Sequence, residues 1–198
     1  MKKIALILIS VFAAVSFSWA MRSYSTVQYD LVIQQAGIGQ EVTTRVYTKG
    51  KKSRMEMQVS GMKSISLFDG AQAYTYIPSQ NMAMAVPMQQ MASQVPTIEN
   101  YQEDCQYLGD ETVDGKYCGV YNCAKGTSPI KMWIDKAVDF LVKTESRGTT
   151  AYYKNVVFDV PLDDSMFSLP AGVKPQDMST MMQGMQGMTD MGAEQSQH

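Results

Sequence analysis

Residues 63–91, KSISLFDGAQAYTYIPSQNMAMAVPMQQM, decide the fold of this chain. Short apolar and aromatic segments alternate here with the turn sequences Asp-Gly and Pro-Ser-Gln-Asn, which predicts three antiparallel strands joined by tight turns. The expected strands are residues 64–68, 73–77 and 82–86. Methionines give this meander a soft apolar face, suited to holding apolar ligands of variable shape; they are Met82, Met84, Met88 and Met91.

The same two-residue alternation continues on both sides of this stretch, which predicts further strands in consecutive antiparallel order. They are residues 24–33, 40–48 and 53–59 before it, and 105–112, 116–123, 130–134, 140–145 and 150–160 after it. Residues 89–95 combine helix-tolerant residues with an apolar stripe, so a short helix is expected there, over the mouth of the sheet. Residues 161–170 are expected to be irregular, with Met166, Phe167 and Leu169 packing back on the body.

The first twenty residues have the features of a cleaved secretory signal peptide. Lys2 and Lys3 precede an apolar run at residues 4–17, and Ser18-Trp19-Ala20 provides a cleavage site. The apolar run is shorter than the ~20 residues that span a bilayer, which makes an uncleaved anchor the weaker alternative. We therefore expect a periplasmic protein with a signal peptide at 1–20, one domain at 21–174 and a tail at 175–198.

The tail is rich in methionine and glutamine. Pro175-Gln176-Asp177 is expected to begin a weak helix with Asp177 as N-cap, or a segment that is disordered without a partner. Its apolar stripe is expected to act as a lid; the residues are Met178, Met181, Met182 and Met185. The alternative for these thioethers is Cu(I) binding, which soft sulfur ligands favour.

Charge and motifs exclude several classes of function. The formal net charge of −2 becomes −4 when Lys2 and Lys3 are removed, which argues against a nucleic-acid partner. The one histidine, His198, is the last residue, so no Ser-His or Cys-His pair can form on the fold. Asp163-Asp164 follows Pro161 and indicates a solvated turn. We expect a monomeric protein that is not an enzyme and holds no cofactor or resident metal.

Three cysteines, Cys105, Cys118 and Cys123, stand in a chain expected in an oxidising compartment. Asp114-Gly115 predicts a hairpin turn, whose arms place Cys105 and Cys123 at nearly mirrored positions. Cys118 and Cys123 are an odd number of residues apart and so face opposite sides of a regular strand. The pairing Cys105–Cys123 is therefore favoured, with Cys105–Cys118 as the alternative.

The order of the motifs resembles the periplasmic lipoprotein-carrier (LolA-like) superfamily, in the form of its uncharacterised members. The resemblance covers about residues 24–173 and rests on five segments: GKKSRMEM, SLFDGAQAYTYIPSQNMAMAV, LGDETVDGKYCGVYNC, KMWIDKAVDFLVKTES and YYKNVVFDVPLDDSMFSLPAGV. It implies a mainly β fold with few helices, an antiparallel half-open β-barrel around an apolar cavity. The carriers have a long helix before the first strand; here residues 89–95 and the Met-rich C-terminal tail are expected to serve as lids.

The resemblance also implies a function: a non-enzymatic carrier that holds a lipid, an acyl chain or a lipoprotein, with transient membrane contact. The residues expected to line the cavity are Leu67, Tyr74, Tyr76, Met82, Met84, Met88, Met91 and Trp133. The alternative is a structural or sensory module of the envelope that binds another protein, and Cu(I) binding by the tail is a second alternative.

Overall fold

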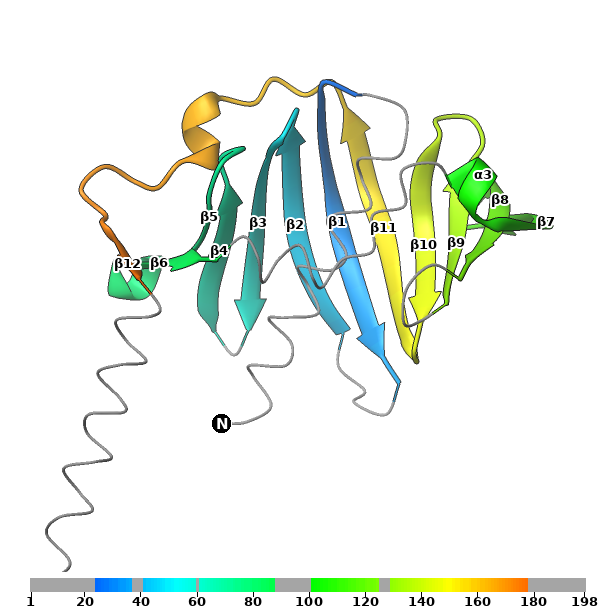
Figure 1. Ribbon diagram of the computed structural model, residues 1–198, viewed down its shortest axis with the longest axis horizontal. Helices are drawn as coiled ribbons and strands as arrows, with labels where there is room; N and C mark the ends of the chain where they lie inside the picture. Colours follow the sequence, from blue (N-terminus) through cyan, green and yellow to red (C-terminus); the bar gives the residue numbers. More distant parts are fainter. Residues whose placement is uncertain (1–23, 37–40, 60, 88–100, 125–128, 178–198) are drawn as a thin grey trace, which may run out of the picture.

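The computed structural model describes residues 24–36, 41–59, 61–87, 101–124 and 129–177, and its strands form one twelve-stranded sheet (Figure 1). The strand order is β12-β6-β5-β4-β3-β2-β1-β11-β10-β9-β8-β7. All pairs are antiparallel except β12 with β6, and the two ends of the order do not pair with each other. The predicted mainly β, antiparallel and half-open architecture is confirmed.

The strands agree closely with the expected ones. They are β1 Thr26–Gln35, β2 Glu41–Lys49, β3 Lys52–Val59, β4 Met62–Phe68, β5 Ala73–Ile77, β6 Met82–Val86, β7 Gln106–Val113, β8 Lys116–Cys123, β9 Ile130–Asp135, β10 Phe140–Ser146, β11 Thr149–Phe158 and β12 Pro175–Asp177. Short helical turns are η2 Pro78–Gln80, α3 Tyr101–Asp104 and η3 Asp164–Phe167. The helix expected at residues 89–95 lies outside the described residues, as does the tail from residue 178.

Hairpin turns set the register of the second half of the sheet. Asp114 and Gly115, between β7 and β8, have φ of 49° and 77°. Arg147 and Gly148 repeat this pattern between β10 and β11, with φ of 47° and 73°. Two consecutive positive φ angles are typical of the type I′ turn, whose twist matches that of the strands. The predicted Asp114-Gly115 turn is confirmed.

The two halves of the chain meet where β1 pairs with β11. Strands β2 to β6 extend from one side of β1, and β10 to β7 extend from β11. Aromatic rings hold this junction together: Tyr29 lies 5.7 Å from Phe140 and 5.5 Å from Tyr153, measured between ring centroids. All three side chains are buried. The core of the molecule is therefore centred on this non-local strand pair.

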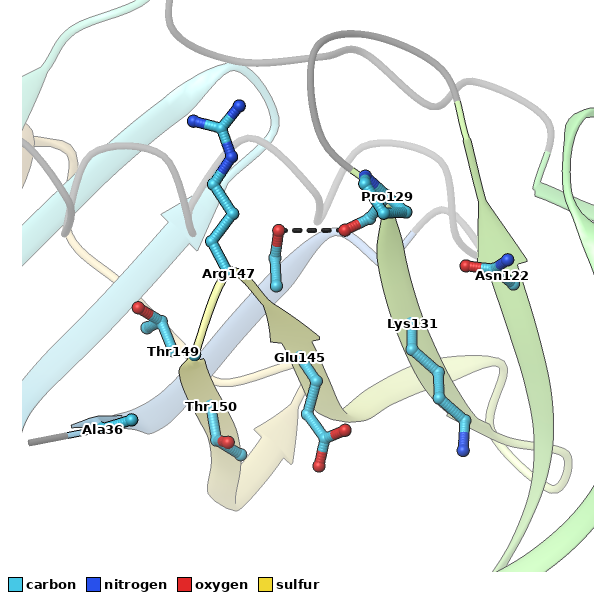
Figure 2. Close-up of a pocket in the computed structure, with 10 residues that line it drawn as sticks. Ala36, Asn122, Pro129, Lys131, Glu145, Arg147, Thr149 and Thr150 are labelled. Carbon is cyan, nitrogen blue, oxygen red and sulfur yellow. Dashed lines mark hydrogen bonds between the residues drawn. The ribbon is translucent and has the colours of Figure 1, made fainter.

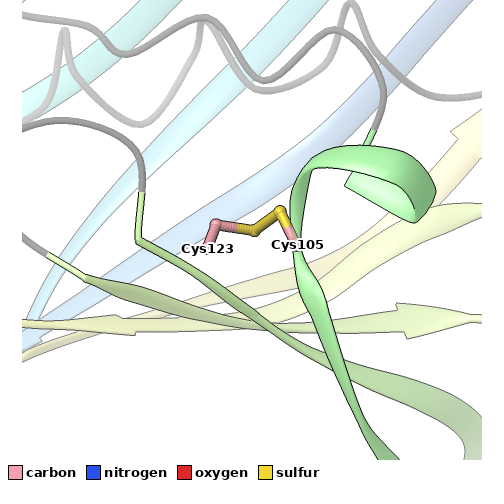
Figure 3. The surroundings of a disulfide bond; sticks show 2 residues. All are labelled: Cys105 and Cys123. Atoms are coloured by element: carbon pink, nitrogen blue, oxygen red, sulfur yellow. A yellow bond between two sulfur atoms is a disulfide. The ribbon is translucent and has the colours of Figure 1, made fainter.

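A disulfide joins Cys105, directly after α3, to Cys123 at the end of β8 (Figure 3). The favoured pairing is confirmed, and the alternative with Cys118 is wrong. Cys118 is a free, fully buried thiol. It pairs across the ladder with Glu111, whereas Cys123 lies an odd number of residues further along β8, on the other face.

Residues 159–174, which we call the strap, run along one end of the sheet from β11 to β12 (Figure 1). Three long side chains fasten it: Lys49 Nζ donates to Leu162 O at 2.8 Å, Lys52 Nζ to Asp164 Oδ1 at 2.9 Å, and Arg54 Nη1 to Met166 O at 2.8 Å. Phe167 has no exposed surface. The packing expected of Phe167 is therefore present.

The strap is followed by a strand that the sequence did not predict. Pro175-Gln176-Asp177 were expected to begin a helix, but they form β12, parallel to β6. Gln176 pairs with Met84. The expectation failed because three residues of low strand propensity form a strand only when another segment supplies a ladder to pair with.

We predict that the disulfide contributes about 3 kcal/mol to the free energy of unfolding, because it closes a loop between residues 18 apart in sequence. The double variant Cys105→Ser, Cys123→Ser should lose this amount in urea titrations and become insensitive to reductant. Cys118→Ala is the control and should respond to reductant as the native chain does. Equal stability of the native chain with and without reductant would contradict the prediction.

Candidate functional site

The two faces of the sheet differ in chemistry. Residues directly opposite in an antiparallel ladder share a face, and successive residues alternate between faces. Tyr29 pairs with Val46, Val46 with Met55, and Met55 with Ser66, so these four side chains lie on one face. The registers of β5 and β6 extend this face to Thr75 and then Met84.

On β1 to β6, as the structure describes them, this face carries no charged side chain, and we call it the uncharged face. All charged residues of β1 to β4 occupy alternate positions on the opposite face. They are Asp30, Glu41, Arg45, Lys49, Lys52, Arg54, Glu56 and Lys63. The separation follows from strict two-residue alternation in each strand, and it leaves one side of these strands without charge.

Burial divides the uncharged face into two parts. Around β1 and β11 the side chains are closed off, with Tyr29, Leu31 and Val46 fully buried. Burial also raises the pKa of Tyr153, although a hydrogen bond with Thr144 opposes the shift. On β4 to β6 most side chains of this face are half-buried, and we call them the half-buried patch: Ser64, Ser66, Phe68, Thr75, Ile77, Met82, Met84 and Val86. Apolar surface is therefore available at β4 to β6.

The opposite face is held by ion pairs. Glu56 receives Arg54 Nε and Lys63 Nζ, each at 2.7 Å from a carboxylate oxygen. Burial alone would raise the pKa of Glu56, but the contacts from Lys63 and Arg54 outweigh it and lower the pKa. Arg45 Nε lies 3.0 Å from Asp30 Oδ1. These charged side chains thus neutralise one another in pairs, as charged side chains commonly do on a solvent-exposed face.

The residues predicted to line a cavity divide between the two faces. Met82 and Met84 lie in the half-buried patch. The others within the described residues lie on the opposite face: Leu67, Tyr74, Tyr76 and Trp133. A ligand on one face therefore contacts only one of these groups. Met88 and Met91 lie outside the described residues, as do the predicted lid residues Met178, Met181, Met182 and Met185.

Leu67 and Trp133 are each packed against neighbouring groups on the opposite face. Leu67, only 1% exposed, pairs with Arg54 on the face that the strap covers through η3. Trp133 donates from Nε1 to Glu111 Oε2 at 2.7 Å, and Lys131 and Lys143 lie 4.4 and 4.3 Å from its ring centroid. Cation–π contacts and a charged hydrogen bond bury this indole on the charged face. Both residues stabilise the exterior of the sheet.

A hollow of about 460 Å³, which the sequence did not indicate, lies at the ends of β8 to β11 (Figure 2). Its lining includes Asn122, Lys131, Glu145, Arg147 and Thr150. Figure 2 shows Arg147 extending away from Lys131 and Glu145, so the charged groups do not converge on one point. Lys131 and Glu145 are opposite each other in the β9–β10 ladder, and Arg147 lies apart from them.

The described residues hold neither a metal-binding cluster nor a membrane-spanning helix. They contain no group of three or more His, Cys, Asp or Glu side chains arranged to hold a metal ion. They also contain no helix with the length and apolar character needed to cross a bilayer. Asp163 and Asp164 have structural partners: Asp163 accepts from Ser165 N at the start of η3, and Asp164 pairs with Lys52 and Lys49.

A family model described as a domain of unknown function, DUF4412, matches residues 30–141. The chain belongs to the DUF4412 family. The match begins in β1 and ends in β10, so it includes the uncharged face of β2 to β6 and the edge strand β7. The DUF4412 chain is also 35% identical over 80 residues to an uncharacterized protein of Methanocaldococcus jannaschii, and the aligned part covers 38% of this chain and 24% of that protein.

Solved structures are similar to this DUF4412 chain at low identity. For the MucA/MucB complex of Pseudomonas aeruginosa the TM-score is 0.47 with 11% identity, covering 85% of this chain and 63% of that chain. For a LolA superfamily protein of Nitrosomonas europaea it is 0.39 with 13% identity, covering 81% and 97%. Likenesses at this level carry no conclusion about the role of this chain.

We predict that Thr44→Val raises the free energy of unfolding by about 1 kcal/mol. Thr44 is fully buried on the uncharged face, and its hydroxyl has no hydrogen-bond partner among the described residues. Burying an unpaired hydroxyl costs ~1–3 kcal/mol, which valine removes at the same shape. The control is Thr26→Val, which should destabilise because Thr26 Oγ1 donates to Val160 O at 2.7 Å. Equal destabilisation by both changes in urea titrations would contradict the prediction.

Proposed function

We propose that this chain is a non-enzymatic binding protein of the periplasm that holds an acyl chain of a lipid or lipoprotein against its uncharged face. The observation that carries the proposal is the separation of charge between the two faces. An acyl chain gains about 0.8 kcal/mol for each CH₂ group that it buries, and a charged lining would oppose that gain. A face without charge over six adjacent strands provides the required lining.

The half-buried patch is the part of this face best suited to an acyl chain. Met82 and Met84 are flexible thioethers that adapt to different chain shapes, and Ile77 and Val86 add branched apolar surface. The hydroxyls of Ser64 and Ser66 on β4 and of Thr75 on β5 lie beside them, close to the backbone and able to meet water or an ester group. The patch therefore favours a molecule that is mostly hydrocarbon with a small polar part.

The proposed compartment rests on two features of the chain. Residues 1–20 have the pattern of a signal peptide, and they lie outside the described residues. The disulfide between Cys105 and Cys123 supports an oxidising compartment, where such bonds persist. Non-enzymatic binding is favoured because the carboxylates of Asp163, Asp164 and Glu56 are engaged in a helix cap and in ion pairs.

We predict that Met84→Lys weakens binding of a fluorescent fatty acid, displaceable by palmitate, by at least about tenfold, because it places an ammonium in the apolar patch. The matched control is Ala85→Lys. Ala85 is the next residue of β6, is also half-buried, and lies on the opposite face. Equal loss of binding in the two variants, with unchanged circular dichroism, would overturn the proposal for this face.

The lid is a further part of the proposal. β12 ends at Asp177 beside Ala85, and Gln176 pairs with Met84, so the tail leaves the sheet next to the half-buried patch. Deleting residues 178–198 is expected to increase the fluorescence of a hydrophobic dye bound to the protein, because the patch loses its cover. A full-length variant with serine at Met178, Met181, Met182 and Met185 should do the same. An unchanged signal in both would count against a lid.

Two other functions are separated from this one by a single measurement. Native mass spectrometry of the protein purified from its own host should show co-purifying lipid if the proposal holds. A bound copper ion in its place would favour Cu(I) binding by the methionines of the tail, and an envelope protein retained without lipid would favour a sensory module.

A further inference from the structure

The outer edge of β7 is a second exposed surface, at the opposite end of the strand order from the half-buried patch. Within the described strands β7 pairs with β8 alone. Tyr107 and Leu108 on β7 are 48% and 49% exposed, and Tyr117 on β8 is 58% exposed. An edge strand presents backbone N–H and C=O groups that can pair with another strand. The edge thus combines ladder positions that no described strand occupies with exposed apolar side chains.

Covalent and polar contacts hold this edge in place. The Cys105–Cys123 disulfide fixes the start of β7 to the end of β8. Asp110 accepts hydrogen bonds from the Tyr107 and Tyr117 hydroxyls and lies 2.5 Å from Lys136 Nζ. Lys136 and then the two tyrosines lower the pKa of Asp110 to about 2. A strand held in this way loses little conformational freedom when a partner binds.

The charged residues of this edge segment are all acidic. Residues 101–115, which form α3, β7 and the turn after it, contain no Lys or Arg. They contain five acidic residues: Glu103, Asp104, Asp110, Glu111 and Asp114. Lysines of the neighbouring β9 region contact two of them, Lys136 at Asp110 and Lys131 at Glu111. The segment still presents a net negative charge along an exposed strand.

We propose that the outer edge of β7 binds an extended peptide segment of a partner protein, rich in Lys or Arg with apolar residues between them, by adding it as a strand. Backbone pairing supplies the geometry, Tyr107 and Leu108 supply apolar contact, and the acidic residues select a basic sequence. A second copy of this chain would place five acidic residues against five, which disfavours self-pairing. The proposal does not depend on the acyl-chain function.

The test is fluorescence anisotropy of a labelled Lys-Val-Lys-Val-Lys-Val peptide with the full chain. We expect it to bind at least about tenfold more tightly than Glu-Val-Glu-Val-Glu-Val, and more weakly as salt is raised. The same basic peptide with alternate backbone nitrogens methylated should lose binding, because it cannot complete a ladder. Equal binding of the methylated peptide, or of the acidic peptide, would overturn the proposal.

Matched variants locate the site. Leu108→Lys should weaken binding of the basic peptide at least about tenfold, whereas Val157→Lys should not, because Val157 is similarly exposed, at 46%, but lies on β11 and pairs with Gln28 of β1, away from the β7 edge. Glu103→Lys provides a second test outside β7 and should weaken binding severalfold. Equal effects of Leu108→Lys and Val157→Lys would overturn the site. Concentration-dependent dimers abolished by Leu108→Lys would show that a second copy is the occupant.

Discussion

The pairing of β1 with β11 is the contact on which the rest of the structure depends. It joins strands more than a hundred residues apart, with Val27 opposite Phe158 and Ile33 opposite Ala151. Without this pair the chain would form two separate meanders, and neither meander would bury its core side chains against the other. Tyr29, Phe140 and Tyr153 meet only because this pair forms. The aromatic core of the sheet therefore lies across this junction.

Much of the architecture was predictable because two-residue alternation and Asp-Gly or Arg-Gly turns are local signals. The disulfide was predictable because the Asp114-Gly115 turn sets the register of its hairpin. The role of each face of β4 was not predictable. Leu67 is apolar and was expected to line a ligand cavity, yet it lies on the charged side and is buried there, paired with Arg54, which donates to Met166 O of the strap. A segment a hundred residues downstream decides that burial, and alternation within β4 cannot report it.

The candidate site was therefore predictable in part. Met82 and Met84 lie in the half-buried patch, since alternation with alanine placed them together. Trp133 lies on the opposite face, where Lys131 and Lys143 flank its ring, and an aromatic side chain can be buried by lysines as well as by apolar neighbours. The cluster of Tyr107, Tyr117, Asp110 and Lys136 has no sequence motif, because its members come from β7, β8 and the turn after β9.

The three-residue strand β12 has a consequence for how molecules of this protein can associate. It covers β6, and it presents outward an edge that is very short and begins with proline, which has no N–H to donate. The other end of the sheet terminates in an eight-residue strand. If strands are added at β7 as we propose, the short, proline-containing β12 disfavours addition at the other end, and the expected assembly is one partner per sheet, not a fibre.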